Sequence, residues 1–306
     1  MSFFATLFSA FVLAQIVRTC IPYVLGAMGG ILTERSGVIQ IGIEGLMLLG
    51  GLACVVAELA TGSPWVGLLA ALAMGAFVGL VHGALVAVFR VDGVISGLAI
   101  NLFALGGTRV ALRTLYRSTS NSPSITGFRW FEGNDGVHSI LRAVVHPTTI
   151  LAIALLLLVP WLLARTTRGL AIRAAGDEPV AARSLGVDVP KARLVAATIG
   201  GALAALGGAS LAQDMHQFQS GMTNGRGFLA IAIVILSGWN FRRAAVFSIC
   251  FAILDACQIV FQGAGRVVGD ALTMLPFIVA LASLAFSMFG SRKKLEPPKG
   301  LGRFET

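Results

Sequence analysis

The chain is dominated by apolar runs of about 20 residues, the length that a helix needs to cross a bilayer. Backbone polar groups in lipid must be satisfied within the protein, so a chain built this way folds as a bundle of membrane helices. We therefore predict an all-α polytopic membrane protein with a single transmembrane domain over residues 1–306. The expected spans cover residues 8–30, 38–60, 65–89, 93–115, 146–164, 194–212, 244–261 and 271–289.

Composition agrees with this class. Only 12% of the residues are charged, whereas soluble domains carry about 25%. Residues 1–17 contain no Lys or Arg, so the basic region of a cleavable signal is missing and the first run is expected to remain as a membrane helix. The net charge of +9 is interpreted as loop charge in a membrane protein, with no nucleic-acid partner.

One further apolar run, residues 227–239, is too short for an ordinary span and predicts a half-helix or a short tilted helix. If it crosses, the chain has nine spans; if it is re-entrant, the chain has eight. With nine spans, most of the 23 basic residues fall on the side of the polar segment 165–193, whereas Arg226 falls in an outer loop. The positive-inside rule then places this segment in the cytoplasm and the N-terminus outside. The polar segment 116–145 becomes an extracytoplasmic loop, and 291–306 a basic cytoplasmic tail.

Segment 165–193 contains a short helix with recognisable ends. Asp177 is a candidate N-cap, Glu178 favours the positive end of the helix dipole, and Pro179 is tolerated in the first turn. Gly186 offers a left-handed stop. About two turns cannot hold a helix unaided in water. The helix is therefore interpreted as a docking element, with an ordinary cytoplasmic loop as the alternative.

Polar residues within or beside the spans are candidates for a transport pathway, because such groups are costly in lipid. Asp255 and Gln258 share one helix face, and Gln213 and Asn224 flank an outer turn. The alternative is that they form local hydrogen bonds between helices. The candidate pathway residues are Glu44, Asn101, Gln213, Asn224, Asp255 and Gln258.

Two further patterns bear on packing and energy supply. Gly75, Gly79 and Gly83 recur every four residues, which predicts close packing of helix backbones. No phosphate-binding loop of the form G-x-x-x-x-G-K-[ST] is present, and no group of residues resembles a metal site. Uphill transport would therefore need an ion gradient or another subunit.

Three segments resemble the permease subunits of bacterial ABC importers for nucleosides and simple sugars, a superfamily that includes ribose-type and branched-chain amino-acid-type permeases. They are LTERSGVIQIGIEGLMLLGG at 32–51, RAAGDEPVAARSLGVDV at 173–189 and GRGFLAIAIVILSGWN at 225–240. Gly-Trp-Asn at 238–240 and Leu-Pro-Phe at 275–277 are most similar to the nucleoside-type branch. The charged turn Phe-Arg-Arg at 241–243 departs from that branch, which usually has an uncharged turn there.

The resemblance implies half of a translocation pore in the bacterial cytoplasmic (inner) membrane. Its partners would be a separate ATPase subunit that binds ATP and Mg, a second permease in a heterodimer, and an extracytoplasmic substrate-binding lipoprotein. The chain itself would hold no cofactor and catalyse no reaction. Residues 177–185 would couple it to the ATPase. The predicted coupling residues are Asp177, Glu178, Pro179, Ala181, Ala182, Arg183, Ser184, Leu185 and Gly186.

The cargo implied by the resemblance is a nucleoside, with a simple sugar or a branched-chain amino acid as alternatives. A hypothesis from another class is an ion-coupled secondary transporter that uses Glu44 and Asp255 as proton or sodium sites. That hypothesis explains the intramembrane acids, but it gives the short capped helix no purpose.

Overall fold

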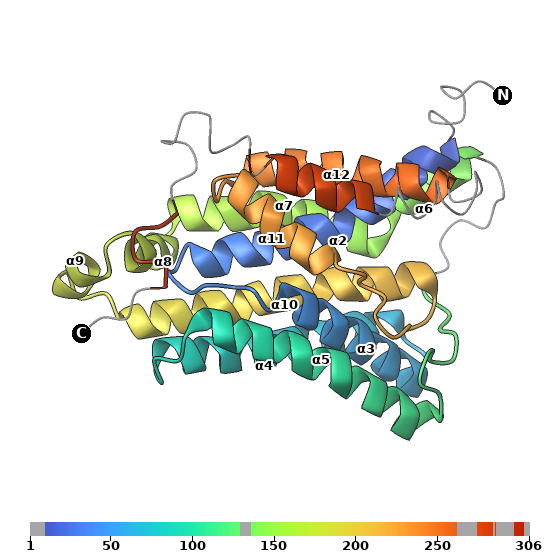
Figure 1. Cartoon of the computed structure of the whole chain (residues 1–306), viewed down its shortest axis with the longest axis horizontal. Coiled ribbons are helices and arrows are strands. Elements are labelled where there is room, and N and C mark those ends of the chain that lie inside the picture. Colours follow the sequence, from blue (N-terminus) through green and yellow to red (C-terminus); the bar gives the residue numbers. More distant parts are fainter. Residues whose placement is uncertain (1–9, 129–135, 262–273, 284, 286–296, 303–306) are drawn as a thin grey trace.

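The computed structural model describes residues 10–128, 136–261, 274–283, 285 and 297–302, and the protein is helical almost throughout (Figure 1). Within these described residues, six helices are long and apolar enough to cross a membrane, namely α2 (Ala10–Glu34), α3 (Ile43–Thr61), α4 (Pro64–Ala87), α5 (Gly93–Tyr116), α7 (Pro147–Arg165) and α10 (Val189–Met215). The others are α6 (Gly136–Val145), α8 (Thr167–Asp177), α9 (Pro179–Ser184), α11 (Arg226–Leu236), α12 (Phe241–Phe261) and the helix Met274–Ser283. The prediction of an all-α polytopic membrane protein is confirmed.

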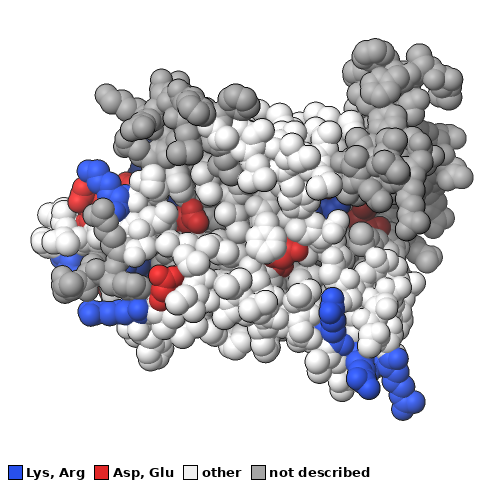
Figure 2. All heavy atoms as spheres, in the orientation of Figure 1, with Lys and Arg blue, Asp and Glu red and all other residues white. Residues whose placement is uncertain are grey.

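The long helices lie side by side along one axis (Figure 1). We call the end that carries α8, α9 and residues 297–302 the α9 end, and the opposite end, which carries α6, the α6 end. Lys and Arg gather at the two ends of the face shown in Figure 2, and most of the middle is uncharged. A largely uncharged middle belt between basic ends is what a bundle embedded in lipid requires.

Helix α10 is the central element, and it packs on α2, α3 and α4 through glycines. A Cβ atom added to Gly75 or Gly79 would run into the carbonyl oxygens of Gly201 and Ala197 on α10. On α10 itself, a Cβ atom at Gly208 would collide with the backbone of Met47. The predicted role of the four-residue glycine spacing in close helix packing is confirmed.

The second predicted span is not helical from its start. Residues 38–41 have no regular structure, and α3 begins at Ile43. Glu44 therefore lies in the first turn of α3, and the predicted start of the second helix at residue 38 is wrong. The non-helical stretch is held by side chains from elsewhere: Glu34 accepts from the Gln40 N–H (3.3 Å), and the His82 ring donates to the Ile39 carbonyl (3.0 Å).

The short run at 227–239 also forms only a partial helix. α11 has 11 residues, about 16 Å of helix against roughly 30 Å of hydrocarbon. Gln219, before α11, pairs with Asn121 beyond the end of α5. The Trp239 carbonyl, after α11, accepts from the Arg35 side chain beyond the end of α2.

These two contacts lie at opposite ends of the bundle, because α2 ends at the α9 end and α5 at the α6 end (Figure 1). The segment that contains α11 therefore runs from one end of the bundle to the other. Of the predicted ninth span, 271–289, residues 274–283 form a helix. Its residues 271–273, 284 and 286–289 lie outside the described part of the chain.

Candidate functional site

The N-termini of α3 and α11 meet inside the bundle, and Glu44 joins them. One carboxylate oxygen of Glu44 accepts from the Thr223 hydroxyl (2.6 Å) and the Gly225 N–H (3.0 Å). The other accepts from the Gly227 N–H (2.7 Å). The N-cap residue of α11 is Gly225, which has no side chain of its own to cap the helix. Glu44 supplies that cap from another helix and places a negative charge at the positive end of α11.

Asn101, on α5, caps the N-terminus of α3. Its carbonyl oxygen accepts from the Gly45 N–H (2.8 Å), and its amide group donates to the Ile41 carbonyl (3.0 Å). A Cβ atom at Gly45 would lie only 2.9 Å from the Asn101 Cα, so the two backbones touch. Asn101 thereby satisfies backbone groups on both sides of the point where the second crossing changes from extended chain to helix.

We call the place where the N-termini of α3 and α11 meet the break. Asp255, on α12, forms a buried ion pair beside it. It accepts from the Arg226 guanidinium (2.9 and 3.0 Å) and from the Tyr23 hydroxyl (3.1 Å). The predicted position of Arg226 in an outer loop is wrong. It is the first residue of α11, and only 16% of its side chain is exposed because Asp255 draws it inward.

The remaining candidate pathway residues divide between the break and the α6 end. Asn224 directly precedes Gly225, is exposed, and has a left-handed backbone with φ of 44°. Gln258 is half-buried, three residues beyond Asp255 on α12. Gln213 lies apart from the break: its amide donates to Glu58 (2.5 Å).

Glu58 is a buried acid that the sequence analysis missed. It lies near the end of α3 and is almost fully enclosed. Besides Gln213, it accepts from the Gly127 N–H (2.8 Å), which fastens the loop after α5 to the bundle. The signal was present in the sequence, since Glu58 falls within the predicted span 38–60. A carboxylate within a membrane span needs a hydrogen-bonding partner, and this holds for Glu58 as it does for Glu44.

At the α9 end, the predicted short helix exists with shifted ends. Asp177 is the last residue of α8 rather than the cap of α9. Glu178 takes the cap position without a side-chain cap bond, and Pro179 opens α9. The predicted stop at Gly186 is confirmed, since its φ is 84°. The expected cap at Asp177 is wrong because α8 continues up to that residue and fixes its backbone as helix.

Two large apolar side chains are exposed on α9 and at its C-cap. Leu185 is 84% exposed and Val180 71% exposed, whereas Ala182 is buried against Ala175 and Val189. Val180 was absent from the predicted coupling residues. An apolar side chain in the middle of a charged segment was the signal that could have found it. Val180 on α9 and Leu185 at its C-cap therefore leave two large apolar side chains open at this end of the bundle.

A continuous set of backbone contacts links α9 to the break. The end of α8 packs on the turn at 35–37, where a Cβ atom at Gly176 would collide with the Arg35 carbonyl. From this turn the non-helical stretch 38–41 leads directly into α3 and Glu44. The eight non-helical residues 35–42 therefore connect the end of α8, which precedes α9, to the start of α3.

Residues 297–302 bind across the same corner. The Gly300 N–H donates to the Gly176 carbonyl (2.8 Å), and the Gly302 N–H donates to the Gly37 carbonyl (3.1 Å). Lys299 pairs with Glu178 (2.9 Å) at the surface. This part of the tail thus ties the end of α8 to the turn at 35–37.

Removal of residues 297–306 is expected to raise amide hydrogen exchange in α9 roughly tenfold, because two backbone hydrogen bonds are lost. Exchange measured on the full chain and on the truncated chain checks this. Lys299→Ala is the matched control and should change exchange little, since an exposed ion pair contributes about 0–1 kcal/mol. Equal exchange in the truncated and full chains would show that the tail does not hold the corner.

Polar side chains gathered at two interrupted crossings of an apolar helix bundle define a membrane transport protein. Among the described residues, no group of His, Cys, Asp and Glu could hold a metal ion. Residues 12–281 match the family described as the branched-chain amino acid transport system / permease component. The chain belongs to this family.

Individual relatives agree with this assignment. The guanosine ABC transporter permease protein NupQ of Bacillus subtilis is 32% identical over 299 residues, covering 92% of each chain. The nucleoside ABC transporter permease protein NupC of Lactococcus lactis is 27% identical and covers 90% of this chain and 91% of its own length. The glucose ABC transporter permease protein TsgB13 of Haloferax volcanii is 28% identical, with 82% and 70% covered. The predicted resemblance to the nucleoside-type branch is confirmed.

Proposed function

We propose that this chain forms half of the pore of an ATP-driven importer for a nucleoside, in the cytoplasmic membrane of a bacterium. The observation that carries the proposal is the contact path from the exposed face of α9 to the two capped helix starts. An importer driven by a separate ATPase needs a surface for that subunit and a way to pass its motion to the solute path. The exposed apolar side chains at α9 and the contact path behind them support both requirements.

The proposed partners follow from the two ends of the bundle. An ATPase subunit, which binds ATP and Mg, docks on α9 with Val180 and Leu185 as apolar anchors. The predicted coupling set from Asp177 to Gly186 surrounds these anchors. A second permease completes the pore, and a substrate-binding lipoprotein docks at the α6 end.

The α6 end offers that lipoprotein a composite surface. The loop after α5 pairs with the segment after α10, because the Ser122 N–H donates to the Phe218 carbonyl (2.9 Å) and the Ile125 N–H to the His216 carbonyl (2.9 Å). Docking on either segment therefore acts on both. The segment after α10 continues to Thr223 and the break. Docking of the lipoprotein at the α6 end and binding of ATP at the α9 end would therefore both act on the break.

In this mechanism the ATPase moves α9, and the corner at Gly176 passes the motion to the turn at 35–37. The non-helical stretch then shifts the start of α3 relative to α11. Since Glu44 and Asn101 hold both helix starts, the break acts as one element with two arrangements that open alternately to the two sides. Asn224, exposed at the break, is the candidate to contact solute.

The ion-coupled alternative is less well supported by the geometry. Both oxygens of Glu44 already accept hydrogen bonds from the backbone or a hydroxyl, and Asp255 is paired with Arg226. A carrier of protons or sodium needs a carboxylate that can release its protein donors during each cycle. Here such release would leave the start of α11 or the Arg226 charge unsatisfied in the membrane interior.

Reconstitution with the ATPase, permease and lipoprotein encoded by neighbouring genes tests the proposal. We expect uptake of radiolabelled guanosine or another nucleoside that requires ATP and survives an ionophore. Uptake that persists without ATP and collapses with the ionophore would establish a secondary transporter instead. Glucose and a branched-chain amino acid serve as parallel solutes, and transport of either one alone would assign the cargo differently.

A further inference from the structure

The part of α5 nearest the α6 end carries a row of three arginines. Arg109, Arg113 and Arg117 recur every four residues, so they follow one side of the helix at intervals of about 6 Å. All three side chains are exposed. Figure 2 shows Lys and Arg side chains projecting from the surface at the α6 end, where α5 lies in Figure 1. We call these three residues the arginine row.

The fold fixes the direction of the arginine row. Ala104 and Leu112 lie on the other side of α5 and are buried in the bundle, so the arginines point away from it. The Arg109 side chain donates to the Ser220 hydroxyl (3.1 Å), which is an uncharged acceptor. Arg117 is the C-cap of α5 and has a left-handed backbone with φ of 55°, a conformation that favours glycine.

This side of α5 is poorly suited to lipid. Arg109 lies seven residues before the last residue of α5, which corresponds to about 10 Å of helix. An arginine at that depth is costly against hydrocarbon. Within the described chain, α5 also has the smallest buried share of the six long helices. The arginine row therefore faces water or another protein.

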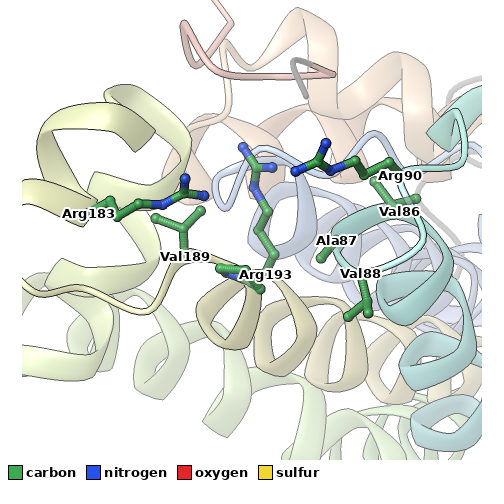
Figure 3. A pocket seen from close by; sticks show the side chains of 8 residues that line it. Val86, Ala87, Val88, Arg90, Arg183, Val189 and Arg193 are labelled. Carbon is green, nitrogen blue, oxygen red and sulfur yellow. The ribbon is translucent and has the colours of Figure 1, made fainter. Parts of the chain in front are cut away.

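The position of the arginine row also runs against the usual distribution of charge. In the proposed orientation the α6 end lies outside, where Lys and Arg are normally scarce. Basic residues are expected at the α9 end, and Figure 3 shows Arg90, Arg183 and Arg193 beside a pocket there. Arg193 is used within the fold, since it donates to the Ser36 carbonyl (3.3 Å). The exposed row at the opposite end needs a different explanation.

Acids of this chain do not neutralise the arginine row. Within the described residues, no acid forms an ion pair with any of its three members. Glu58 and Asp214 lie at the same end, but Glu58 accepts from Gln213, and Asp214 pairs with Arg18 (3.0 Å). The charge of the row is therefore open to a partner from outside the chain.

We propose that the arginine row is the docking contact for an acidic patch on the substrate-binding lipoprotein. The inference rests on the proposed function, which supplies this partner. Guanidinium groups form paired, charge-assisted hydrogen bonds with carboxylates, and a basic row steers an acidic protein toward its contact surface. The matching patch carries carboxylates about 6 Å apart, the interval of the row.

The arginine row is also connected to the break. Arg109 binds Ser220, and the Ser220 N–H donates to the Ser120 carbonyl (2.8 Å) in the loop after α5. The same segment continues to Thr223, whose hydroxyl donates to Glu44 (2.6 Å). A lipoprotein bound to the row therefore contacts the segment that leads to the start of α11.

The test is the affinity of the purified lipoprotein encoded by neighbouring genes for the complete complex in nanodiscs, measured by biolayer interferometry. Phosphatidylcholine nanodiscs are compared with nanodiscs that also contain phosphatidylglycerol. Wild-type affinity should fall as salt rises. Arg113→Glu and Arg117→Glu should each lower affinity at least about tenfold, the loss of one charge-assisted contact. Both side chains are exposed, so the variants should fold normally.

Two controls accompany these variants. Arg113→Lys keeps the charge and should retain most of the affinity. Arg168→Glu makes the same charge reversal at an exposed arginine of α8, at the opposite end, and should bind as the wild type does.

The inference is overturned if Arg113→Glu and Arg117→Glu bind like the wild type, or if Arg168→Glu weakens binding equally. It is also overturned if the variants differ from the wild type only in phosphatidylglycerol nanodiscs, which would assign the row to lipid headgroups. These results leave the proposed function intact. A lipoprotein that does not bind the wild-type complex at all would contradict both.

Discussion

Replacement of Val180 and Leu185 together by Asp should lower ATP-driven uptake by at least about 30-fold, the effect of losing an apolar anchor of a protein interface. Both side chains are mostly exposed, so the double variant should reach the membrane and unfold at the wild-type temperature. The expected defect lies in the contact with the ATPase, because two carboxylates would replace two apolar side chains in a desolvated surface. Uptake and ATP hydrolysis, measured together in proteoliposomes, separate uncoupling from simple loss of the complex.

Leu170→Asp is the matched control. Leu170 is 59% exposed on α8, outside the proposed contact surface. If it lowers uptake as strongly as the double variant, α9 has no special role. If the double variant transports normally, the proposed coupling surface is wrong. Bulky replacements at Ala182 are a poorer test, since Ala182 is buried against α8 and α10, and a larger side chain would disturb the fold.

Local signals in the sequence predicted the position of α9. Pro179 and Gly186 mark the ends of α9 because their backbone preferences act within one or two residues. The actual cap position and the inward direction of Ala182 depend on α8 and α10. Those contacts join residues that are distant in the sequence, so no pattern within α9 could reveal them.

The non-helical stretch before α3, which forms part of the break, was not predicted from the sequence. Residues 38–42 read VIQIG, which continues the apolar run of the second span. This stretch stays non-helical because its partners lie elsewhere: Glu34, His82 and Asn101 bind its backbone. Arg226 was misplaced for a similar reason, since Asp255 lies 29 residues away. Both errors occur where tertiary partners replace local hydrogen bonds, which is where transport proteins place their solute paths.

Glu44→Gln should lower the stability of the protein by about 2–3 kcal/mol, although glutamine has nearly the same shape. The carboxylate accepts three hydrogen bonds with its two oxygens. Glutamine offers one oxygen and an NH₂ group, so at least one N–H donor of the α11 start would face another donor. An unsatisfied buried donor costs about 1–3 kcal/mol, and lipid offers no water as a substitute. Glu44→Ala removes all three acceptor contacts and should abolish both folding in detergent and uptake.

Thermal unfolding in detergent, followed beside uptake in proteoliposomes, decides what Glu44 does. The control is Glu178→Gln, the same chemical change in an exposed pair with Lys299, which should alter stability by no more than about 1 kcal/mol. If Glu44→Gln is as stable as the wild type and yet fails to transport, Glu44 meets the solute or an ion directly, and the cap is not its main role. If stability and uptake fall together, the carboxylate holds two broken helices in register. The solute path is then controlled by the backbone that Glu44 positions.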